Sequence, residues 1–378
     1  MIERLGLLTP RYPPTRAGGG EQSVQLLAEH LAQSDRIGEI TVFSFDGSRT
    51  STVGEVTVRR LGDVSGRVTE LQNLAALRRI RRWIGSVDLI HAYNMELNPL
   101  AGYLSARHSI RSVATLNSYH FLKAHEVNRV PDRLERLYEL IGYPTTGRIL
   151  RHYQRQTDRF VAISDAIKRI YSDHGLPADR ITTVPNMYDP AFDPPPLTEP
   201  SNPYSLIYVG ELTRKKGVHV LLRALAQLPA PYQLRIVGTG PHESEFRTLV
   251  RELDLTERVE FTGRVPYEQI GEAYAGASLF VHPGIIPEAF GRTIIEAMQS
   301  GLPVVCTDVG GPPDIVLDKE LVCASNSADA LAAAILRADS VERDPSAYRQ
   351  YVEENFAPET VTEQMINVYE AVAAADPV

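Results

Sequence analysis

Short apolar runs alternate with segments of helical periodicity through the first half of the chain. An apolar run at 5–8 and a glycine run at 18–20 precede a segment of helical periodicity over 23–32, which predicts a strand, a tight loop and a helix. Further predicted elements are strands at 40–45, 56–61, 88–91, 112–116 and 160–163 and helices at 71–83 and 166–173. Residues 121–151 are polar and rich in Tyr and Arg, and we expect them to depart from the core fold.

The same alternation is clearer in the second half. The predicted strands are 205–209, 233–237, 259–261, 279–282, 304–307 and 321–323, and the predicted helices are 218–228, 243–253, 267–275, 293–299 and 328–338. Short, nearly continuous apolar strands separated by helices indicate parallel sheets that are covered on both faces. The chain is therefore predicted to be an α/β protein.

Prolines crowd the segment 190–203, where they allow neither a helix interior nor a central strand. A length of 378 residues suits two domains of similar size. We expect two doubly wound, Rossmann-like domains that face a central cleft. The first covers residues 1–190, the second covers 204–356, and a proline-rich linker at 191–203 joins them.

Composition narrows the class of protein further. The apolar fraction of 43% and the charged fraction of 23% are ordinary for a globular protein, and the net charge of -8 argues against a nucleic-acid partner. Cys306 and Cys323 lack the spacing of a metal site and fit buried strand cysteines in a reducing compartment. The chain has no signal peptide and no apolar run of about 18 residues. We therefore expect a cytoplasmic protein.

The segment 287–298 carries the first candidate chemistry, because ligands of doubly wound sheets bind at the carboxyl ends of the strands. It follows the predicted strand 279–282 and enters a helix near Gly291. Free N–H groups at a helix start suit a diphosphate, and carboxylates accept hydrogen bonds from sugar hydroxyls. Glu288 could hold a transferred sugar and Glu296 a ribose. The spacing alone equally fits a loop and helix with two surface glutamates.

A basic loop follows the first predicted strand of the second half. It runs from Gly210 to Gly217 and contains three consecutive basic residues, Arg214, Lys215 and Lys216. A tight loop at a strand end with this charge is a plausible anion site. A solvated basic loop is the alternative, and the position opposite the predicted diphosphate helix favours the anion site.

Two further glycine turns follow strands. Gly238 lies in a Gly-x-Gly turn that lacks the complete dinucleotide fingerprint. Gly263, Arg264 and Val265 could line a nucleobase pocket or form an ordinary turn.

Together these segments resemble the retaining glycosyltransferases of family 4. The resemblance rests on the order and spacing of five motifs, namely 208–210 leading to 216–217, 237–241, 259–263, Glu288 and Glu296 with seven residues between them, and 301–305 leading to 310–311. It runs along nearly the whole chain and implies a GT-B fold whose second domain holds the nucleotide-sugar donor. It also implies that the final helix, at about 357–378, packs back on the first domain.

The resemblance implies roles for individual residues. Glu288 would contact the donor sugar, Glu296 the ribose, and Lys216 the leaving phosphate. The implied catalytic residues are Lys216, Arg214, Glu288, His120 and Asn117. The implied donor-binding residues are Gly19, Gly20, Gly210, Gly238, Gly263, Arg264, Val265, Ala289, Phe290, Gly291, Arg292, Thr293 and Glu296. No metal site is implied, and we find no Asp-x-Asp pair and no cluster of His or Cys.

Two departures from the family pattern bear on these roles. Asn117 stands where the family often has His, with His120 three residues further on, so either could contact the donor sugar or the acceptor. Glu211 stands where the family often has Arg, and Arg214 or Lys215 could supply the missing charge. In the first domain, residues 18–21 are similar to the glycine-rich acceptor loop of the family.

The implied reaction moves a hexose-type sugar from a nucleotide diphosphate sugar to a glycan or a lipid-linked acceptor with retention and without a cofactor. UDP is the favoured nucleotide and GDP the other candidate. A nucleotide-sugar 2-epimerase of the same fold and an inactive nucleotide-sugar-binding partner are the alternatives. A nicotinamide oxidoreductase is disfavoured because the glycine fingerprint is absent after the first strand.

The predicted helix 71–83 adds a possible contact with a membrane. It carries basic residues beside apolar ones, at Arg78, Arg79, Arg81 and Arg82. Such a helix could touch an anionic membrane surface. A helix that covers the sheet with its basic face in solvent is the favoured interpretation of the pattern.

Overall fold

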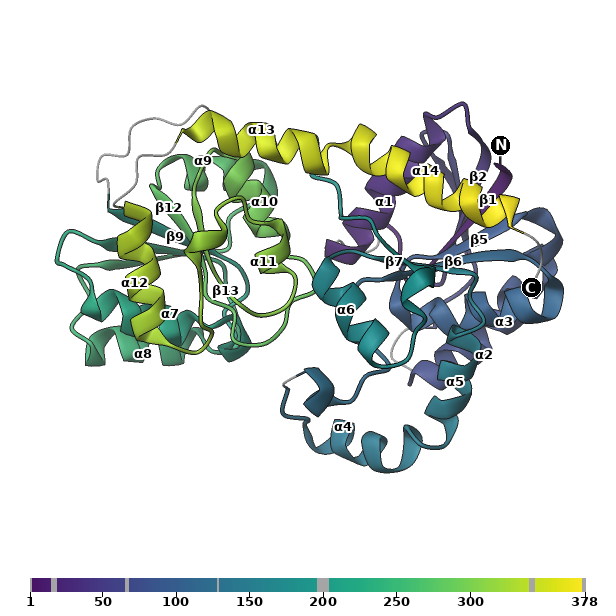
Figure 1. Ribbon diagram of the computed structural model, residues 1–378, viewed down its shortest axis with the longest axis horizontal. Helices are drawn as coiled ribbons and strands as arrows, with labels where there is room; N and C mark the ends of the chain where they lie inside the picture. Colours follow the sequence, from purple (N-terminus) through teal and green to yellow (C-terminus); the bar gives the residue numbers. More distant parts are fainter. Residues whose placement is uncertain are drawn as a thin grey trace. The chain divides into compact units, whose positions relative to one another are not determined.

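The computed structural model describes residues 2–14, 19–64, 68–127, 129–195, 204–339 and 344–375. The chain forms two compact units (Figure 1). The first combines Met1–Met187 with Pro358–Val378, and the second is Tyr188–Ala357. The last segment of the sequence therefore belongs to the first unit.

The described part of the first unit contains an eight-stranded sheet with the order β3-β4-β2-β1-β5-β6-β7-β8. Its strands are β1 (Ile2–Thr9), β2 (Ile37–Ser44), β3 (Thr50–Val53), β4 (Val56–Arg60), β5 (Leu89–Ala92), β6 (Arg111–Leu116), β7 (Arg159–Ala162) and β8 (Ile181–Thr183). Neighbouring strands are parallel except at the β3–β4 hairpin. The sheet is thus doubly wound around β1.

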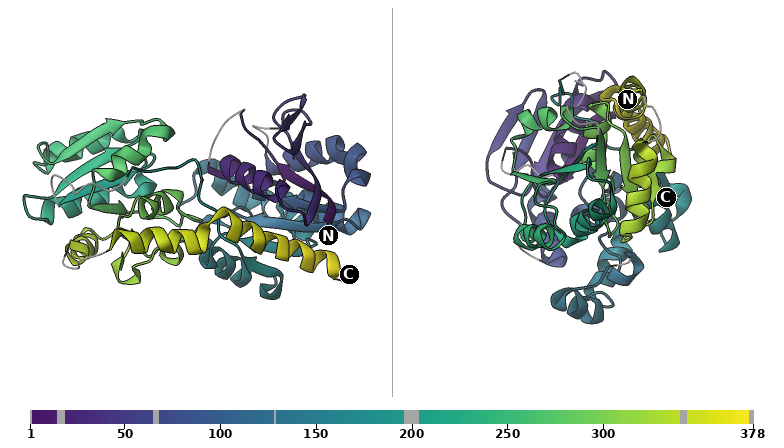
Figure 2. Two further views of the ribbon diagram at one scale, coloured as in Figure 1. Left: turned by 90° about the horizontal axis from the view of Figure 1, so that it is seen from above. Right: turned by 90° about the vertical axis from the view of Figure 1, so that its left-hand side faces the viewer.

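Helices cover both faces of this sheet, and the side-chain alternation of β1 shows how. Leu7 packs into a core with α1 (Gly19–Ala32) and α14 (Pro358–Ala374), which lie on one face (Figure 2). Leu8 points to the other face, where α2 (Thr69–Ile80) and α3 (Asn98–His108) contribute to a separate core. Successive residues of a strand face opposite sides, so a continuous apolar strand requires two such cores.

Polar contacts fix α14 to the first unit. The Tyr369 hydroxyl lies 2.7 Å from Nδ1 of His91 in β5, and the other ring nitrogen lies 2.7 Å from the Thr115 hydroxyl in β6. Complete burial lowers the pKa of His91 to about 3, so the ring is neutral. At the surface, Arg36 pairs with both Glu363 and Glu370.

The segment 121–151 forms a helical excursion between β6 and β7. It contains the short helices η3 (Ala124–Val127), α4 (Arg133–Leu137) and η4 (Tyr138–Gly142), the last of π type, and then α5 (Thr146–Gln154). The chain returns to β7 and continues through α6 (Asp165–Asp173) to β8. The excursion thus adds no strand to the sheet.

The described part of the second unit contains a six-stranded sheet with the order β11-β10-β9-β12-β13-β14. All of its strand pairs are parallel. Its strands are β9 (Ser205–Val209), β10 (Gln233–Val237), β11 (Val259–Gly263), β12 (Leu279–His282), β13 (Val304–Thr307) and β14 (Val322–Cys323). Its main helices are α7 (Val218–Gln227), α8 (Glu243–Glu252), α9 (Ile270–Ala275), α10 (Arg292–Gln299), α12 (Ala328–Asp339) and α13 (Pro345–Phe356).

The core of the second unit is built from the strands and from α7, α8 and α12. Cys306 in β13 and Cys323 in β14 are both buried and both unpaired. Burial raises the pKa of the Cys323 thiol to about 11, which keeps it protonated at neutral pH.

Candidate active site

The second unit has a topological switch point at β9. The chain winds from β9 through β10 to β11 on one side and then places β12, β13 and β14 on the other, so β9 pairs with both β10 and β12. The order of the strands reverses at β9, and ligands of doubly wound sheets bind at such a point. The two loops also contact each other, since the Ile285 amide donates to the Lys215 carbonyl at 3.1 Å.

Gly217 allows this close approach. Its φ of 76° lies in the left-handed region, and a Cβ placed on it would stand 1.7 Å from the carbonyl oxygen of Pro283. A side chain at this position would push the two loops apart. The glycine therefore holds Lys216, the residue before it, beside the loop that follows β12.

Lys216 meets Glu288 at this switch point. Its Nζ lies 2.7 Å from Oε2 of Glu288, and Nε2 of His282 lies 3.0 Å from the same oxygen. The side chains of Lys216 and Glu288 are 27% and 30% exposed, so a ligand can reach both. Burial opposes ionisation of Glu288, but hydrogen bonds and positive charge from His282 and Lys216 outweigh it and hold the pKa of that carboxyl well below its usual value.

The backbone of Glu288 is fixed independently of its side chain. Glu288 forms a parallel bridge with Gly310, and its carbonyl accepts the Gly311 amide at 2.7 Å. The carboxylate is thus presented by an anchored loop.

Helix α10 begins directly after this loop. Gly291 is its N-cap residue and provides no side chain to accept hydrogen bonds from the first-turn amides. Uncapped amides at a helix start form an anion site with the helix dipole. Phe290 is buried against Phe356 with ring centroids 6.1 Å apart, so it contributes backbone rather than side chain. Ala289, Arg292 and Thr293 are partly exposed.

Glu296 lies in α10 and is perturbed in the opposite direction from Glu288. Burial raises the pKa of its carboxyl, although the charge of Arg292 and a hydrogen bond from the Tyr274 hydroxyl at 3.1 Å partly oppose the shift. Two carboxylates of one segment are thus held in different environments. Such divergent environments are typical of functional sites.

Other predicted residues of the second unit occupy the neighbouring turns. The Gly210 amide donates to Val237, and the Gly238 amide donates to Gly263, so the ends of β9, β10 and β11 are tied in a row. Arg264 is exposed and Val265 half-buried after the edge strand β11. Arg214 does not join Lys216 and Glu288, because its Nη2 pairs with Glu245 of α8 at 2.9 Å on the surface.

The predicted residues of the first unit lie at the carboxyl ends of its strands. Asn117 follows β6 and donates from Nδ2 to the Tyr93 carbonyl at 3.0 Å. His120 is exposed, with Nδ1 3.0 Å from the Ser118 hydroxyl. Gly19 and Gly20 are the first residues of α1, whereas Gly18 lies outside the described residues.

Models of two known glycosyltransferase families match consecutive parts of the chain. "Glycosyltransferase Family 4" matches residues 17–192, and "Glycosyl transferases group 1" matches residues 191–355. The chain belongs to the family 4 glycosyltransferases. This confirms the family inferred from the motifs.

Solved structures with the GT-B fold confirm the predicted architecture of this family 4 chain. Sucrose-phosphate synthase from Thermosynechococcus elongatus matches with a TM-score of 0.76 and 23% identity, over 99% of this chain and 100% of that one. HepE from Anabaena in complex with UDP and glucose matches with a TM-score of 0.72 and 18% identity, over 98% of this chain and 100% of that one. At these identities the likeness shows the fold.

A curated relative is WcaL of Escherichia coli K12, which is assigned to colanic acid biosynthesis as a glycosyltransferase. It is 30% identical over 247 residues, which cover 59% of this chain and 61% of WcaL. The chain therefore matches less than two thirds of that relative's length.

Sequence reasoning about this family 4 chain missed His282. His282 is the last residue of β12, and its side chain is 5% exposed. Its contact with the Glu288 carboxylate orients that side chain. Its Nδ1 is buried without a hydrogen-bond partner among the described residues. The available signal was a polar residue that closes an otherwise apolar strand, at the strand end where ligands bind.

Two further findings concern the described residues alone. No group of three or more His, Cys, Asp and Glu side chains there is placed to hold a metal ion. None of the helices described is both long enough and apolar enough to cross a bilayer.

Proposed function

We propose that this family 4 glycosyltransferase moves a hexose-type sugar from a nucleotide diphosphate sugar to a glycan or lipid-linked acceptor, with retention of the anomeric configuration. UDP is the favoured nucleotide and GDP the alternative, and we expect the reaction to occur in the cytoplasm without a metal ion. The contact between Lys216 and Glu288 at the β9 switch point carries the proposal. Family membership and the UDP and glucose bound by HepE support it.

The second unit is proposed to bind the donor. The uncapped first turn of α10 would accept the diphosphate, with Lys216 neutralising the leaving phosphate. Glu288 would accept a hydroxyl of the transferred sugar and Glu296 a ribose hydroxyl. Lys216 is already beside Glu288, so the group that binds the phosphate and the group that binds the sugar are positioned together before the donor arrives.

The proposed step breaks the bond between the anomeric carbon and the phosphate oxygen. The acceptor oxygen forms a new bond to that carbon on the same face, and the acceptor's hydroxyl proton passes to the leaving phosphate. No protein carboxylate attacks the sugar, in contrast to retaining glycosidases. The fixed positive groups of the second unit lower the barrier by stabilising the charge that develops on the leaving phosphate.

A ligand screen by thermal unfolding tests the donor site. UDP, GDP, ADP, their sugars and NAD are compared with and without EDTA, on the wild type and on Lys216→Ala and Glu296→Ala. We expect one nucleotide diphosphate to raise the melting temperature, without an effect of EDTA, and both variants to lose the shift. A folded wild type that responds to no nucleotide would contradict the donor site and favour an inactive partner protein.

The stereochemistry needs a separate measurement. Once the donor is known, the anomeric coupling of the product in proton NMR shows retention or inversion. Conversion of the donor to an epimer without any acceptor would replace the transferase proposal with the 2-epimerase.

A further inference from the structure

Exposed apolar side chains are concentrated in two segments of the first unit. Ten of the twelve large apolar side chains that are exposed among the described residues lie within 68–74 or 130–149. They are Val68, Leu71, Leu74, Val130, Leu134, Leu137, Tyr138, Leu140, Ile141 and Ile149. We call these ten residues the apolar rim. Contiguous exposed apolar surface of this kind marks an interaction site, whereas isolated exposed leucines do not.

The excursion half of the apolar rim is folded but not packed. None of the residues of α4 and η4, all of which the structure describes, is buried. Polar contacts hold the excursion instead. Asp132 and Glu135 form a capping box at the start of α4, Glu139 accepts the Ala124 amide at 2.6 Å, and the Arg151 guanidinium stacks on the Tyr143 ring at 3.5 Å. The leucines are therefore not needed to hold the segment together.

In helix α2, too, apolar side chains are exposed, and here polar side chains are buried in their place. Its buried residues include Gln72 and Asn73, and the Asn73 amide donates to the carbonyls of Thr69 and Glu96. Leu71 and Leu74 point outward and are 53% and 45% exposed. A helix that only covered a sheet would bury its leucines and expose its amides.

The two halves of the rim form one surface. Oε1 of Glu70 in α2 accepts the Tyr138 hydroxyl at 2.9 Å and the Thr146 hydroxyl at 2.8 Å. In Figure 1 and in the right view of Figure 2, the excursion around α4 stands away from the sheet of the first unit, and Figure 1 shows that it leads into α5. The leucines of α4 and η4 are therefore placed to enter a flat partner.

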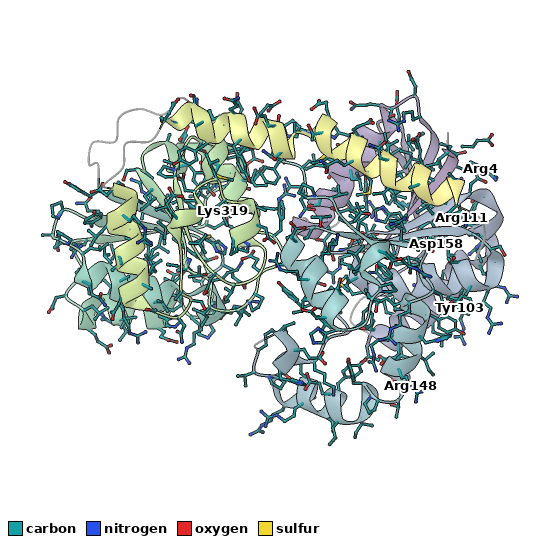
Figure 3. The ribbon with its side chains drawn as sticks, in the orientation of Figure 1. Arg4, Tyr103, Arg111, Arg148, Asp158 and Lys319 are labelled. Carbon is teal, nitrogen blue, oxygen red and sulfur yellow. The ribbon has the colours of Figure 1, made fainter. Side chains whose placement is uncertain are left out.

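Positive charge surrounds the rim although the whole chain is acidic. Residues 121–155 contain seven Lys and Arg against four Asp and Glu, and residues 69–86 contain four Arg against one Glu, in a chain with net charge -8. Within these two segments, the exposed arginines that form none of the ion pairs found among the described residues include Arg78, Arg81, Arg82, Arg133, Arg136 and Arg148, the last labelled on α5 in Figure 3.

We infer that the apolar rim and its arginines dock the first unit onto an anionic lipid bilayer. Leucines that enter the region between headgroups and acyl chains, flanked by arginines at the level of the headgroups, are the arrangement that binds such a surface. The charge of this region favours a lipid surface over a second copy of this acidic chain as the partner, because the local positive patch complements a negative surface. The inference rests on the first unit and is independent of the donor proposed above.

Vesicle flotation tests the inference on the full chain. Wild type is compared on vesicles of neutral phosphatidylcholine and on vesicles that contain about a third phosphatidylglycerol. We expect binding to the anionic vesicles that falls as salt is added, because surface charges are screened. Binding to neither kind of vesicle would overturn the inference.

Two variants separate the apolar and charged contributions. The triple change Leu134→Gln, Leu137→Gln and Ile141→Gln should weaken binding roughly a hundred-fold or more, because three apolar side chains lose their burial. The double change Arg133→Gln and Arg136→Gln should weaken it by roughly five-fold per arginine. All five side chains are exposed, so the fold should survive, and a melting temperature equal to that of wild type would check this.

The matched control is Tyr267→Gln with Leu336→Gln. These are the two exposed large apolar residues of the described chain that lie outside the rim, and the control should bind like wild type. Equal binding by the triple variant and wild type would overturn the inference. So would a wild-type dimer that the triple variant converts to monomer with no change in vesicle binding, because the rim would then be a protein interface.

Discussion

The two units have the same topology at their switch points, but the side chains that meet there are charged in one unit and neutral in the other. In the second unit, the loops after β9 and β12 bring together charged side chains, Lys216 and Glu288. In the first unit, the loops after β1 and β5 are joined by neutral groups, since the Thr9 hydroxyl donates to the Asn94 side chain at 2.9 Å. The fold thus determines where a ligand binds, while the loop residues determine what binds. We therefore expect the charged diphosphate of the donor to bind to the second unit and the hydroxyl groups of an acceptor to bind to the first.

Removing the positive charge of the second unit should have the largest effect. Lys216→Ala should lower the rate of sugar transfer roughly a hundred- to a thousand-fold, as for other fixed groups that stabilise transition-state charge. The matched control is Arg223→Ala, an exposed cation of α7 in the same unit. Steady-state kinetics with the identified donor measure the transfer rates of both variants. Equal rates would contradict a special role for the positive charge of Lys216 in the second unit.

His282 should have the next largest effect as a positioning residue. His282→Ala removes the hydrogen bond from His282 that orients the Glu288 carboxylate, but it leaves the hydrogen bond from Lys216. We expect kcat to fall roughly ten-fold, because the bound sugar is misaligned, while KM for the donor changes less. A rise in KM alone, with kcat intact, would instead assign His282 to simple binding.

The neutral side of the comparison should be less sensitive. Asn117→Ala and His120→Ala should each lower transfer roughly ten-fold or less, because each removes a single hydrogen-bonding group. The melting shift caused by the nucleotide should stay at its wild-type size in both variants, because we propose that the nucleotide binds to the second unit. A lost shift in either variant would mean that the first unit binds the donor as well.

The two glutamates should have opposite, smaller effects on stability without ligand. Glu288 has a depressed pKa, so its contribution to stability is fully present above the ordinary value of 4.5 and is lost as pH falls from there through the depressed value. Glu296 has a raised pKa, so its contribution is present below 4.5 and is lost as pH rises through the raised value. At neutral pH, Glu288→Gln should therefore destabilise the protein by about 1 to 2 kcal/mol, and Glu296→Gln should stabilise it.

Urea unfolding of the two variants at neutral pH and at pH near 4 measures these effects. The difference for Glu296→Gln should shrink near pH 4, because that carboxylate, with its raised pKa, then approaches the neutral state of a glutamine. The difference for Glu288→Gln should largely persist there, because the depressed pKa keeps Glu288 ionised in the folded protein. Shifts of the same sign at neutral pH would show that the two carboxylates share one environment.

The elements around the candidate site could be predicted because they depend on local pattern. The strands that precede Gly210 and Glu288 are short apolar runs, and glycine marks the turns after them. Pairing between distant side chains could not be predicted in this way. Arg214 and Lys216 are two residues apart, yet one pairs with Glu245 and the other with Glu288. Only the packing of α8 and the loop after β12 decides between them.

Where the helices differ from those predicted, the differences have physical causes. Helix α3 (Asn98–His108) was missed because most of its first seven residues are buried, so it shows no alternation of faces. Helix α1 begins at Gly19, four residues before the predicted start, because the glycines take helical geometry rather than ending the loop. The buried face of α2 holds Gln72 and Asn73 beside Ala76 and Ile80, whereas Leu71 and Leu74 are exposed, which the pattern of the sequence did not indicate.

The membership of α14 in the first unit has a consequence for the order of events during synthesis. The ribosome makes the sheet of the first unit early, but Val361, Met365 and Tyr369 belong to the core on one of its faces. Domains generally fold as units while the chain emerges, and here the second unit has its full sequence before the first does. The half that is synthesised first therefore completes its folding last, and until then the part of its sheet face that α14 covers stays open beside α1.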